Sequence, residues 1–302
     1  MPELPDITVY LEALERRVLG QPIEQVKVPS LFVVRTAVPP LTDVVGKRVV
    51  GLRRLGKRIV LELEGALFVV IHLMIAGRLR WGAPGAKGYG KLTLLSFGFP
   101  NGVLFLTEAS GKKRASVHVI QGEAGLAEFD RGGLEVLDAA AAAFHQALTR
   151  ERHTLKRSLT DPTLFSGIGN AYSDEILHRA RLSPFKLSDA LTAEDEARLF
   201  HATKDVLGEW IRRLRDEVGE GFPEKVTAFR KEMAVHGKYK EPCPVCGTKV
   251  QRIVHADNES NYCPTCQTEG RLLADRALSR LMKDDWPRTL EELEARKRGP
   301  RG

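Results

Sequence analysis

Residues 243–266 read CPVCGTKVQRIVHADNESNYCPTC, and this stretch decides how the C-terminal part of the chain folds. It holds all four cysteines of the 302 residues, as two C-x-x-C pairs separated by sixteen residues. The spacing is typical of a four-cysteine zinc ribbon, in which each pair supplies two thiolates from one tight turn. The segments TKVQRIV and SNYC predict a hairpin between the pairs. We therefore expect one structural Zn²⁺ with four ligands: Cys243, Cys246, Cys263 and Cys266.

Two other uses of these cysteines compete with zinc binding. The clustering of every cysteine in one short segment favours a metal over structural disulfides. A redox C-x-x-C is the second alternative, but two copies at ribbon spacing, outside any βαβ pattern, argue against it. A segment this small cannot bury a core of its own, so the ion would stabilise its fold and leave no ligand position open for catalysis.

Helical patterns occupy the chain before the ribbon. AAAAAFHQAL, RHTLKRSLTD and NAYSDEILHRA predict helices, and a longer helix is expected from Thr192 to about residue 217. The T-A-E-D start of the long helix predicts an N-cap. Its apolar stripe is expected to face a core and consists of these residues: Leu199, Val206, Trp210 and Leu214.

Further toward the N-terminus the pattern changes to β-structure. Between residues 24 and 120, six β-rich runs from KRVVGLRRL to ASVHVIQ are separated by turn signals and predict a sandwich or barrel. Residues 121–138 show no clear period, so a domain boundary is expected there. The tail after the ribbon predicts two short helices split near Pro287. A helix is also expected over residues 5–19, with this apolar stripe: Ile7, Leu11, Leu14 and Val18.

The composition is that of a globular protein with an excess of basic residues. Lys and Arg number 46 against 39 Asp and Glu, which gives a net charge of +7. This excess favours an anionic partner, although a charge that serves only solubility is the alternative. No apolar run approaches the roughly 20 residues of a membrane helix, and the N-terminus lacks a secretory signal pattern. We therefore expect a cytoplasmic protein with no membrane partner.

Three separated stretches resemble one family, the Fpg/Nei group of DNA glycosylases. They are MPELPD at the start, LFSGIGNAYSDEILHRARLSP at residues 164–184, and the four-cysteine ribbon. Between them, LGKRIVLEL (55–63) is similar to the family's strand with a lysine, and IHLMIAGRLR (71–80) to its HLGMSG segment. The resemblance covers nearly the whole chain up to about residue 268, and the order and spacing of its parts make coincidence improbable.

The resemblance implies an α+β multidomain fold and a monomer. Residues 1–130 would form an N-terminal catalytic β-sandwich with an amino-terminal helix, and 131–235 a helix-two-turns-helix DNA-binding domain. Residues 236–268 would form the zinc ribbon and 269–302 a helical, basic extension. The partner would be double-stranded damaged DNA, gripped on both sides of an extruded base.

The resemblance also implies a base-excision-repair glycosylase with abasic-site lyase activity. Removal of Met1 would make Pro2 the N-terminus, and its secondary amine would attack C1′ of the damaged nucleotide. The base would leave, and the resulting Schiff base would drive β- and δ-elimination. Glu3 would protonate the sugar ring oxygen, and Lys57 would act as a general acid and bind a phosphate.

Further residues match DNA-contacting positions of the family. His72 and Asn170 correspond to phosphate contacts, and Lys156 to a lysine near the flipped base. Gly167 and Gly169 would let the backbone approach a phosphate closely. Taken singly, each of these residues also has an ordinary structural reading, such as a buried histidine or a turn-forming asparagine.

The chain departs from the family pattern at three places. Asn258 stands where the ribbon usually carries a phosphate-binding arginine, with Arg252 as a candidate substitute. Ile75, or Met74, would be the apolar wedge in place of the usual methionine. The void-filling loop is replaced by EASGKKRAS, and the tail extends beyond the usual family end. In that loop three basic residues would contact phosphates instead of stacking on bases: Lys112, Lys113 and Arg114.

Two other functions remain open on the sequence. Asn258 and the altered loop favour a catalytically reduced clamp of the same fold that binds DNA damage without excising it. A zinc-ribbon binder of RNA or DNA, unrelated to repair, would leave the Pro-Glu start unexplained.

Overall fold

The computed structural model describes residues 1–224, 226–255, 258–274 and 286–298. The chain forms two compact units, one of Met1–Gly133 with Leu207–Thr227 and one of Leu134–Val206 with Ala228–Gly302. The long helix α6 (Ala193–Val218) contributes to both units. The two units are therefore not consecutive segments of the chain. The four consecutive domains expected from the sequence remain a hypothesis.

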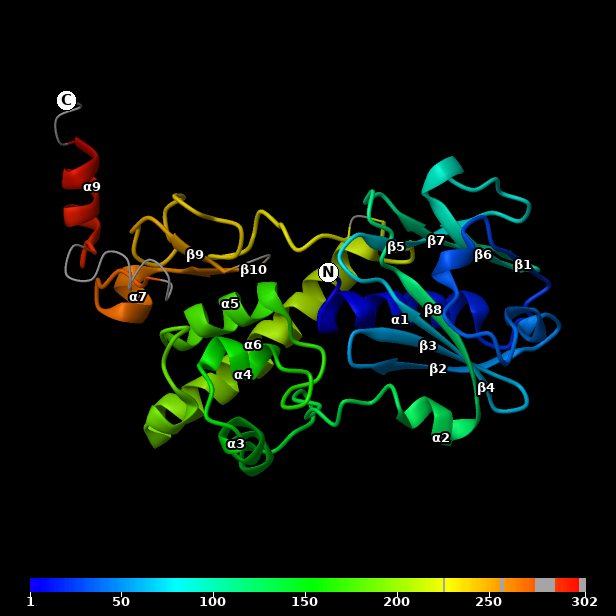
Figure 1. Ribbon diagram of the computed structural model, residues 1–302, viewed down its shortest axis with the longest axis horizontal. Helices are drawn as coiled ribbons and strands as arrows, with labels where there is room; N and C mark the ends of the chain where they lie inside the picture. The colour runs from blue at the N-terminus through cyan, green and yellow to red at the C-terminus, as the bar shows by residue number, and fades with distance from the viewer. Residues whose placement is uncertain (225, 256–257, 275–285, 299–302) are drawn as a thin grey trace. The chain divides into compact units, whose positions relative to one another are not determined.

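The first unit is a β-sandwich with a helix at its amino end, as the sequence predicts (Figure 1). Helix α1 (Leu4–Val18) precedes two four-stranded antiparallel sheets. One sheet has the order β2 (Val49–Leu55), β3 (Arg58–Leu63), β4 (Leu67–His72) and β8 (Ser116–Gln121). The other has the order β1 (Gln25–Lys27), β6 (Thr93–Phe99), β7 (Gly102–Glu108) and β5 (Gly77–Gly82). Short 3₁₀ turns are formed by Leu31–Val33, Leu41–Val44 and Gly90–Leu92.

The core of this unit lies between the two sheets and under helix α1. Ile59 and Leu61 of β3 point into it together with Phe97 of β6 and Leu14 of α1. Val60, the neighbour of Ile59, faces the other side, where helix α2 (Gly122–Ala127) covers the sheet through Leu126. Strands β3 and β4 therefore read as continuous apolar runs because both of their faces are buried.

The second unit begins with helices. They are α3 (Ala141–Thr149), α4 (Leu155–Thr160), α5 (Asn170–Ala180), a 3₁₀ turn at Ser188–Ala190 and the first part of α6. The hydroxyl of Thr192 accepts a hydrogen bond from the backbone N–H of Asp195 at 3.1 Å, which confirms the expected N-cap of α6. The expected stripe of α6 is buried as well: Leu199, Val206, Trp210 and Leu214.

The ribbon follows in the second unit. Strands β9 (Gln251–His255) and β10 (Asn258–Tyr262) form the expected antiparallel hairpin, and helix α7 (Pro264–Thr268) has Cys263 as its N-cap and contains Cys266. Helix α9 (Leu290–Arg298) lies after Pro287, while the helix expected before that proline falls on residues outside the described ranges. Among the described residues, no helix has the length and apolar character that crossing a bilayer requires.

Candidate active site and zinc centre

Several of the expected site residues lie at one end of the sandwich. His72 ends β4 and pairs with Arg58 at the start of β3 and with Ser116 at the start of β8. Gly77 at the start of β5 pairs with Glu108 at the end of β7. We call this end, where β3, β5 and β8 begin and β4 and β7 end, the rim.

The amino terminus belongs to the same end of the unit. Pro2 is buried, and Glu3 is only 3% exposed at the N-cap of α1. The backbone N–H of Glu3 donates to Oδ2 of Asp6 at 3.0 Å, which fixes the entry of the chain into the helix.

Burial lowers the pKa of the α-amino group of Met1. Glu3 raises this pKa, and the cations of Arg78 and Lys57 lower it further. The proposed general acid Lys57 is thus close enough to influence the terminus electrostatically. An amine in this environment is deprotonated more readily than one in water, and only an unprotonated amine is a nucleophile.

Two ionisable residues of the rim are Lys57 and His72. Lys57 lies half-buried in the turn between β2 and β3, next to Gly56 with φ +61°. Burial lowers the pKa of His72 to about 4, and the cations Arg58 and Lys57 lower it as well. His72 is therefore neutral and offers one N–H donor and one acceptor nitrogen instead of a charge.

The turn between β4 and β5 presents Ile75 to solvent. Ile75 is 57% exposed, while Met74 beside it has the left-handed φ of +52°. Gly77 closes this turn with a hydrogen bond from its N–H to the carbonyl oxygen of Leu73 at 2.9 Å, and a Cβ at residue 77 would collide with that oxygen. Arg78 braces the turn, since its guanidinium donates to the carbonyl oxygen of Ile75 at 3.1 Å.

The basic loop after β7, residues 109–115, is anchored by a buried carboxylate. Glu108 is 2% exposed, and its Oε2 accepts from the backbone N–H groups of Arg114 at 2.8 Å and of Ala115 at 3.0 Å. Lys113 donates through Nζ to the carbonyl oxygen of Glu108. The side chains of Lys112, Lys113 and Arg114 are exposed. The loop thus holds three cations on a fixed backbone beside the turn that carries Ile75.

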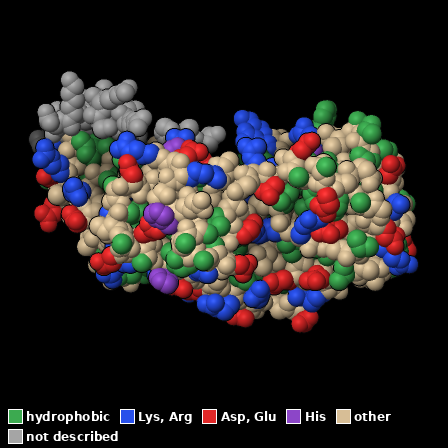
Figure 2. All heavy atoms as spheres, turned by 90° about the horizontal axis from the view of Figure 1, so that it is seen from below, with side chains coloured by type: hydrophobic (Ala, Val, Ile, Leu, Met, Phe, Trp, Pro, Cys, Tyr) green, Lys and Arg blue, Asp and Glu red, His purple; other side chains and the backbone are tan. Residues whose placement is uncertain are grey.

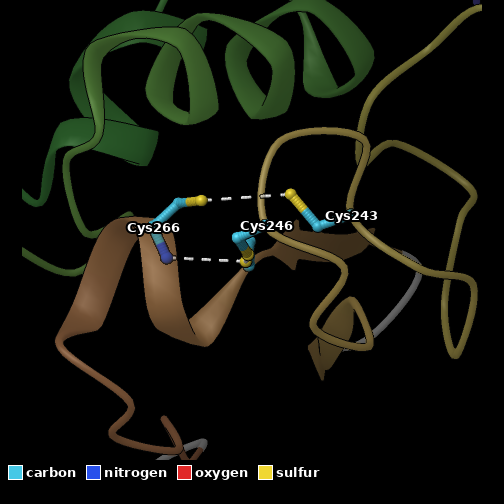
Figure 3. Close-up of side chains that lie close together, drawn as sticks. Cys243, Cys246 and Cys266 are labelled. Atoms are coloured by element: carbon cyan, nitrogen blue, oxygen red, sulfur yellow. Dashed lines mark hydrogen bonds between the residues drawn. The ribbon is translucent and has the colours of Figure 1, made fainter.

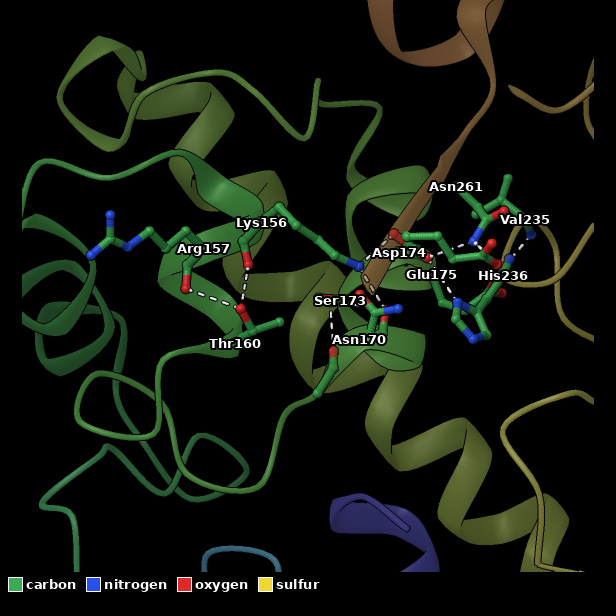
Figure 4. A network of polar contacts seen from close by, with 12 residues as sticks. Lys156, Arg157, Thr160, Asn170, Ser173, Asp174, Glu175, Val235, His236 and Asn261 are labelled. Carbon is green, nitrogen blue, oxygen red and sulfur yellow. Dashed lines mark hydrogen bonds and ion pairs between the residues drawn. The ribbon is translucent and has the colours of Figure 1, made fainter. Parts of the chain in front are cut away.

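In the second unit, Lys156 is committed to a buried ion pair (Figure 4). Its Nζ lies 2.5 Å from Oδ1 of Asp174 and donates to the carbonyl oxygen of Asn170 at 2.6 Å. Only 8% of Lys156 is exposed. In this structure Lys156 therefore orients the start of helix α5 and does not present a free cation at the surface.

The start of α5 has the geometry of an anion site. Asn170 is the first residue of the helix, and Gly169 is its N-cap with φ −131°, an extended conformation open to any residue. Gly167, with φ +80°, is the position in this turn that favours glycine. A helix N-terminus is a common site for phosphate binding, because the helix dipole favours negative charge there.

The middle of α5 holds the segment that leads to the ribbon. Oδ2 of Asp174 accepts from Nδ2 of Asn261 in β10 at 3.2 Å and lies 2.8 Å from Nδ1 of His236 (Figure 4). The carboxylate of Glu175 accepts three backbone N–H bonds, at 2.7 to 2.9 Å, from residues 234–236. Burial raises the pKa of Glu175, and these bonds oppose that shift. The ribbon is therefore tied to α5 by two buried acids.

The four cysteines form a zinc centre. Their sulfur atoms all lie within 4.8 Å of one another, with Cys243 to Cys266 at 3.9 Å and Cys246 to Cys263 at 3.3 Å (Figure 3). Tetrahedral Zn²⁺ with Zn–S bonds of about 2.3 Å requires sulfurs roughly 3.8 Å apart. The residues present thus fit the ion, and all four positions are taken by protein ligands.

The hairpin carries Asn258, at the position of the family's usual arginine, and the candidate substitute Arg252. Asn258 begins β10 opposite His255, and its side chain lies outside the described part of the chain. Arg252 stacks over Tyr239 at 4.5 Å and lies 3.5 Å from a carboxylate oxygen of Glu259. The candidate substitute is therefore held on the hairpin by its own neighbours.

Sequence reasoning missed four residues of these sites, Arg78, Asp174, Glu175 and His178. The partners of the last three are far away in the chain, since Asp174 meets Asn261, Glu175 meets residues 234–236 and His178 meets Cys243 only after folding. The acids within NAYSDEILHRA were visible only as polar residues of a helix.

The basic excess of the chain is not gathered into one field on the face that Figure 2 shows, where Lys and Arg side chains are interspersed with Asp and Glu. Charge on this face alone identifies no anionic partner. The argument for one rests on the placement of individual residues at the rim and at the start of α5.

Comparison with known proteins gives matches along the chain. Residues 1–112 match the family of the formamidopyrimidine-DNA glycosylase N-terminal domain, residues 133–219 its H2TH domain, and residues 240–268 a zinc finger found in FPG and IleRS. A formamidopyrimidine-DNA glycosylase of Thermus thermophilus is 35% identical over 287 residues, which are 89% of this chain and 100% of the relative.

Two solved structures of a Lactococcus lactis protein bound to DNA are also similar to this chain. One is Fpg in complex with a Fapy-dG containing DNA, with a TM-score of 0.78, 26% identity and coverage of 88% of this chain and 100% of that one. The other is a formamidopyrimidine-DNA glycosylase bound non-covalently to an abasic-site DNA, with a TM-score of 0.76, 26% identity and coverage of 88% and 99%.

Proposed function

Because the chain belongs to the formamidopyrimidine-DNA glycosylase family, we propose that it removes damaged bases from double-stranded DNA in base-excision repair. The match to the Thermus thermophilus relative, which is named as a glycosylase, covers the full length of that protein. The two similar structures contain damaged or abasic-site DNA. The observation that carries the proposal is the buried Pro-Glu start at the rim, within the electrostatic influence of Lys57 and Arg78. Since the substrate is DNA and the relatives are bacterial, we place the activity in the bacterial cytoplasm or nucleoid.

The proposed nucleophile is the secondary amine of Pro2 after removal of Met1. Its nitrogen forms a bond to C1′ of the damaged nucleotide, and the bond from C1′ to the base breaks. Opening of the sugar ring then gives an iminium linkage between Pro2 and C1′. Burial and the nearby cations lower the pKa of the amine of Met1, and the same surroundings would favour an unprotonated amine on Pro2 once Met1 is removed.

Glu3 and Lys57 are the proposed acid–base residues. A buried carboxyl beside the nucleophile can protonate the sugar ring oxygen as the ring opens, and Glu3 is 3% exposed at that position. Lys57 would donate a proton and hold the phosphate next to the lesion. Loss of the 3′ and then the 5′ phosphate by β- and δ-elimination from the iminium would give abasic-site lyase activity.

The remaining candidates are proposed DNA contacts. Neutral His72 would donate one N–H to a phosphate oxygen, and Asn170 at the start of α5 would bind another. Ile75 would fill the space of the extruded base, while Lys112, Lys113 and Arg114 would contact phosphates. Lys156 would act indirectly, through its bond to the carbonyl oxygen of Asn170.

A catalytically reduced clamp is the second candidate function. It is favoured by the absence of an arginine at position 258 and by the hold of Glu259 on the nearest substitute, Arg252. Such a protein would bind abasic or damaged DNA without forming the iminium.

Borohydride trapping on an abasic duplex separates the two functions. We expect a covalent adduct with the wild-type chain, located on Pro2 by mass spectrometry, and none with Pro2→Gly. Glu3→Gln should bind the duplex and excise damaged bases at a strongly reduced rate. Tight binding without any adduct would favour the clamp, and an adduct formed by a chain that still begins with Met1 would refute the assignment of the nucleophile.

A further inference from the structure

Within the described part of the chain, a hydrogen bond from outside the ribbon reaches the zinc centre. Nε2 of His178, on helix α5, lies 3.2 Å from Sγ of Cys243. Both side chains are buried, with 6% of His178 and 2% of Cys243 exposed. A zinc-bound thiolate carries no proton, so the hydrogen of this bond belongs to Nε2.

Two other sulfurs take their donors from their own turns. Sγ of Cys263 accepts from the backbone N–H of Cys266 at 3.5 Å, and Cys246 is hydrogen-bonded by Thr248. Four thiolates around Zn²⁺ carry a net charge of about −2, which N–H donors spread and stabilise. Cys243 differs from Cys246 and Cys263 because its donor comes from another part of the second unit.

Helix α5 presents one face to the ribbon. His178 follows Asp174 by four residues, so the two side chains lie one turn apart on the same side of the helix. Asp174 contacts Asn261 of β10, and beyond the end of the helix the carbonyl oxygen of Leu182 accepts from Nε2 of Gln267 at 2.9 Å. In this row, the hydrogen bond from His178 is the one that reaches the sulfur atom of a described zinc ligand.

We propose that His178 is a positioning residue of the zinc centre. Its Nε2–H donates to the Cys243 thiolate and fixes the orientation of that ligand, so that the zinc affinity of the ribbon depends on helix α5. The dependence is reciprocal, because zinc binding then stabilises the helix that begins at Asn170. This inference concerns the metal and stands apart from the proposed excision chemistry.

The matched variants His178→Gln and His178→Met test the donor with side chains of equal length. Gln places an amide N–H near the position of Nε2, whereas Met fills similar space without a donor. In the full chain, competition with a chromogenic chelator should show zinc affinity lowered between about tenfold and a hundredfold by His178→Met. His178→Gln should remain within about threefold of the wild type.

Cobalt substitution supplies a spectroscopic readout of the same bond. A thiolate that loses a hydrogen bond donates electrons more readily, so the sulfur-to-cobalt charge-transfer band should move to lower energy in His178→Met and not in His178→Gln. Asn261→Leu is the control, since it removes the contact between β10 and Asp174 of α5, while the hydrogen bonds of Asn261 go to Asp174 and Glu259 and not to a cysteine. Its band should stay in place even where its zinc affinity falls.

Equal zinc affinities for the Gln and Met variants would overturn the proposal, and so would an unmoved band in His178→Met. Circular dichroism should show that both variants are folded. If the Met variant is not, His178→Phe, which fills the space of the ring, takes its place in the same comparison.

Discussion

The half-buried imidazole of His72 at the rim should contribute to a dependence of the stability of the chain on pH. The folded pKa of His72 is about 4, below its ordinary value of 6.5. Between these values the unfolded chain binds a proton at His72 and the folded chain does not, so stability is lost as the pH falls through this window. The full shift corresponds to about 3 kcal/mol.

His72→Gln should therefore flatten the fall in unfolding free energy between pH 6.5 and about 4, measured by urea titration at several pH values. His201→Gln, at an exposed histidine, should leave the slope of the wild type unchanged. A slope in His72→Gln equal to that of the wild type would show that this imidazole is accessible to protons in the folded state.

Gly77 is a second residue at which a substitution should lower the stability of the chain measurably. An alanine Cβ at this position would meet the carbonyl oxygen of Leu73, which also accepts the hydrogen bond that closes the turn. We expect Gly77→Ala to lower stability by about 1–3 kcal/mol, measured by thermal unfolding. Gly111→Ala in the neighbouring basic loop, where a Cβ meets nothing within 4 Å, is the control. Equal melting temperatures for the two variants would mean that the turn yields without cost.

At the scale of elements, the sequence predicted those whose apolar pattern is local. Helix α1 and helix α6 follow from their stripes, and the Thr192 cap marks the start of the second. Strand β5 (GRLRWG) was not recognised as a strand because it lies at a sheet edge and alternates basic with apolar residues. Helix α2 was also missed, since its six residues bury only Leu126. A short element at an edge leaves too few buried positions to create a period.

The residues of the candidate site also fall into two groups, those that a local sequence motif reveals and those that depend on distant partners. Pro2, Glu3 and Lys57 were found because they stand in short motifs that resemble a family. Asp174 and His178 act through partners 87 and 65 residues away, and no local pattern encodes such pairs. The basic loop was visible as KKR, but its anchoring by Glu108 follows only from the strand pairing.

The buried pair of Lys156 and Asp174 joins α4 to α5 and should be costly to break. Asp174→Asn keeps the size of the side chain but leaves the ammonium of Lys156 without its countercharge in a site where Asp174 itself is 1% exposed. Breaking a buried pair from one side costs about 3–5 kcal/mol. Urea unfolding should show this loss for Asp174→Asn and recovery of part of it in Asp174→Asn with Lys156→Met. A loss below about 1 kcal/mol would mean that water reaches the pair.

At the scale of the whole molecule, the division into two units predicts how far the loss of zinc is felt. Cys263 belongs to a small cluster with Val235 and Val250, and none of the described residues of the ribbon belongs to the core of the sandwich. Cys263→Ser should release zinc and weaken binding to damaged DNA while the sandwich stays folded. Metal analysis, a binding titration and hydrogen exchange in β3 and β4 would measure the three effects. Unchanged affinity after metal loss, or lost protection in those strands, would contradict this expectation.

Of the net charge of +7, only those cations that contact the phosphate backbone are expected to contribute to DNA binding. Binding to an abasic duplex should weaken steeply with salt, because each neutralised phosphate releases counterions and adds about 0.9 to the slope of log K against log salt. Lys112→Ala should lower that slope by about 0.9, and joint replacement of Lys112, Lys113 and Arg114 by up to about 2.7. Lys47→Ala removes an equal charge before the start of β2, at the end of the sandwich opposite the rim, and should leave the slope unchanged. If the slope falls equally for Lys47→Ala and Lys112→Ala, binding to DNA depends on the overall charge of the protein. That result would contradict the proposal that the rim is the surface that contacts DNA.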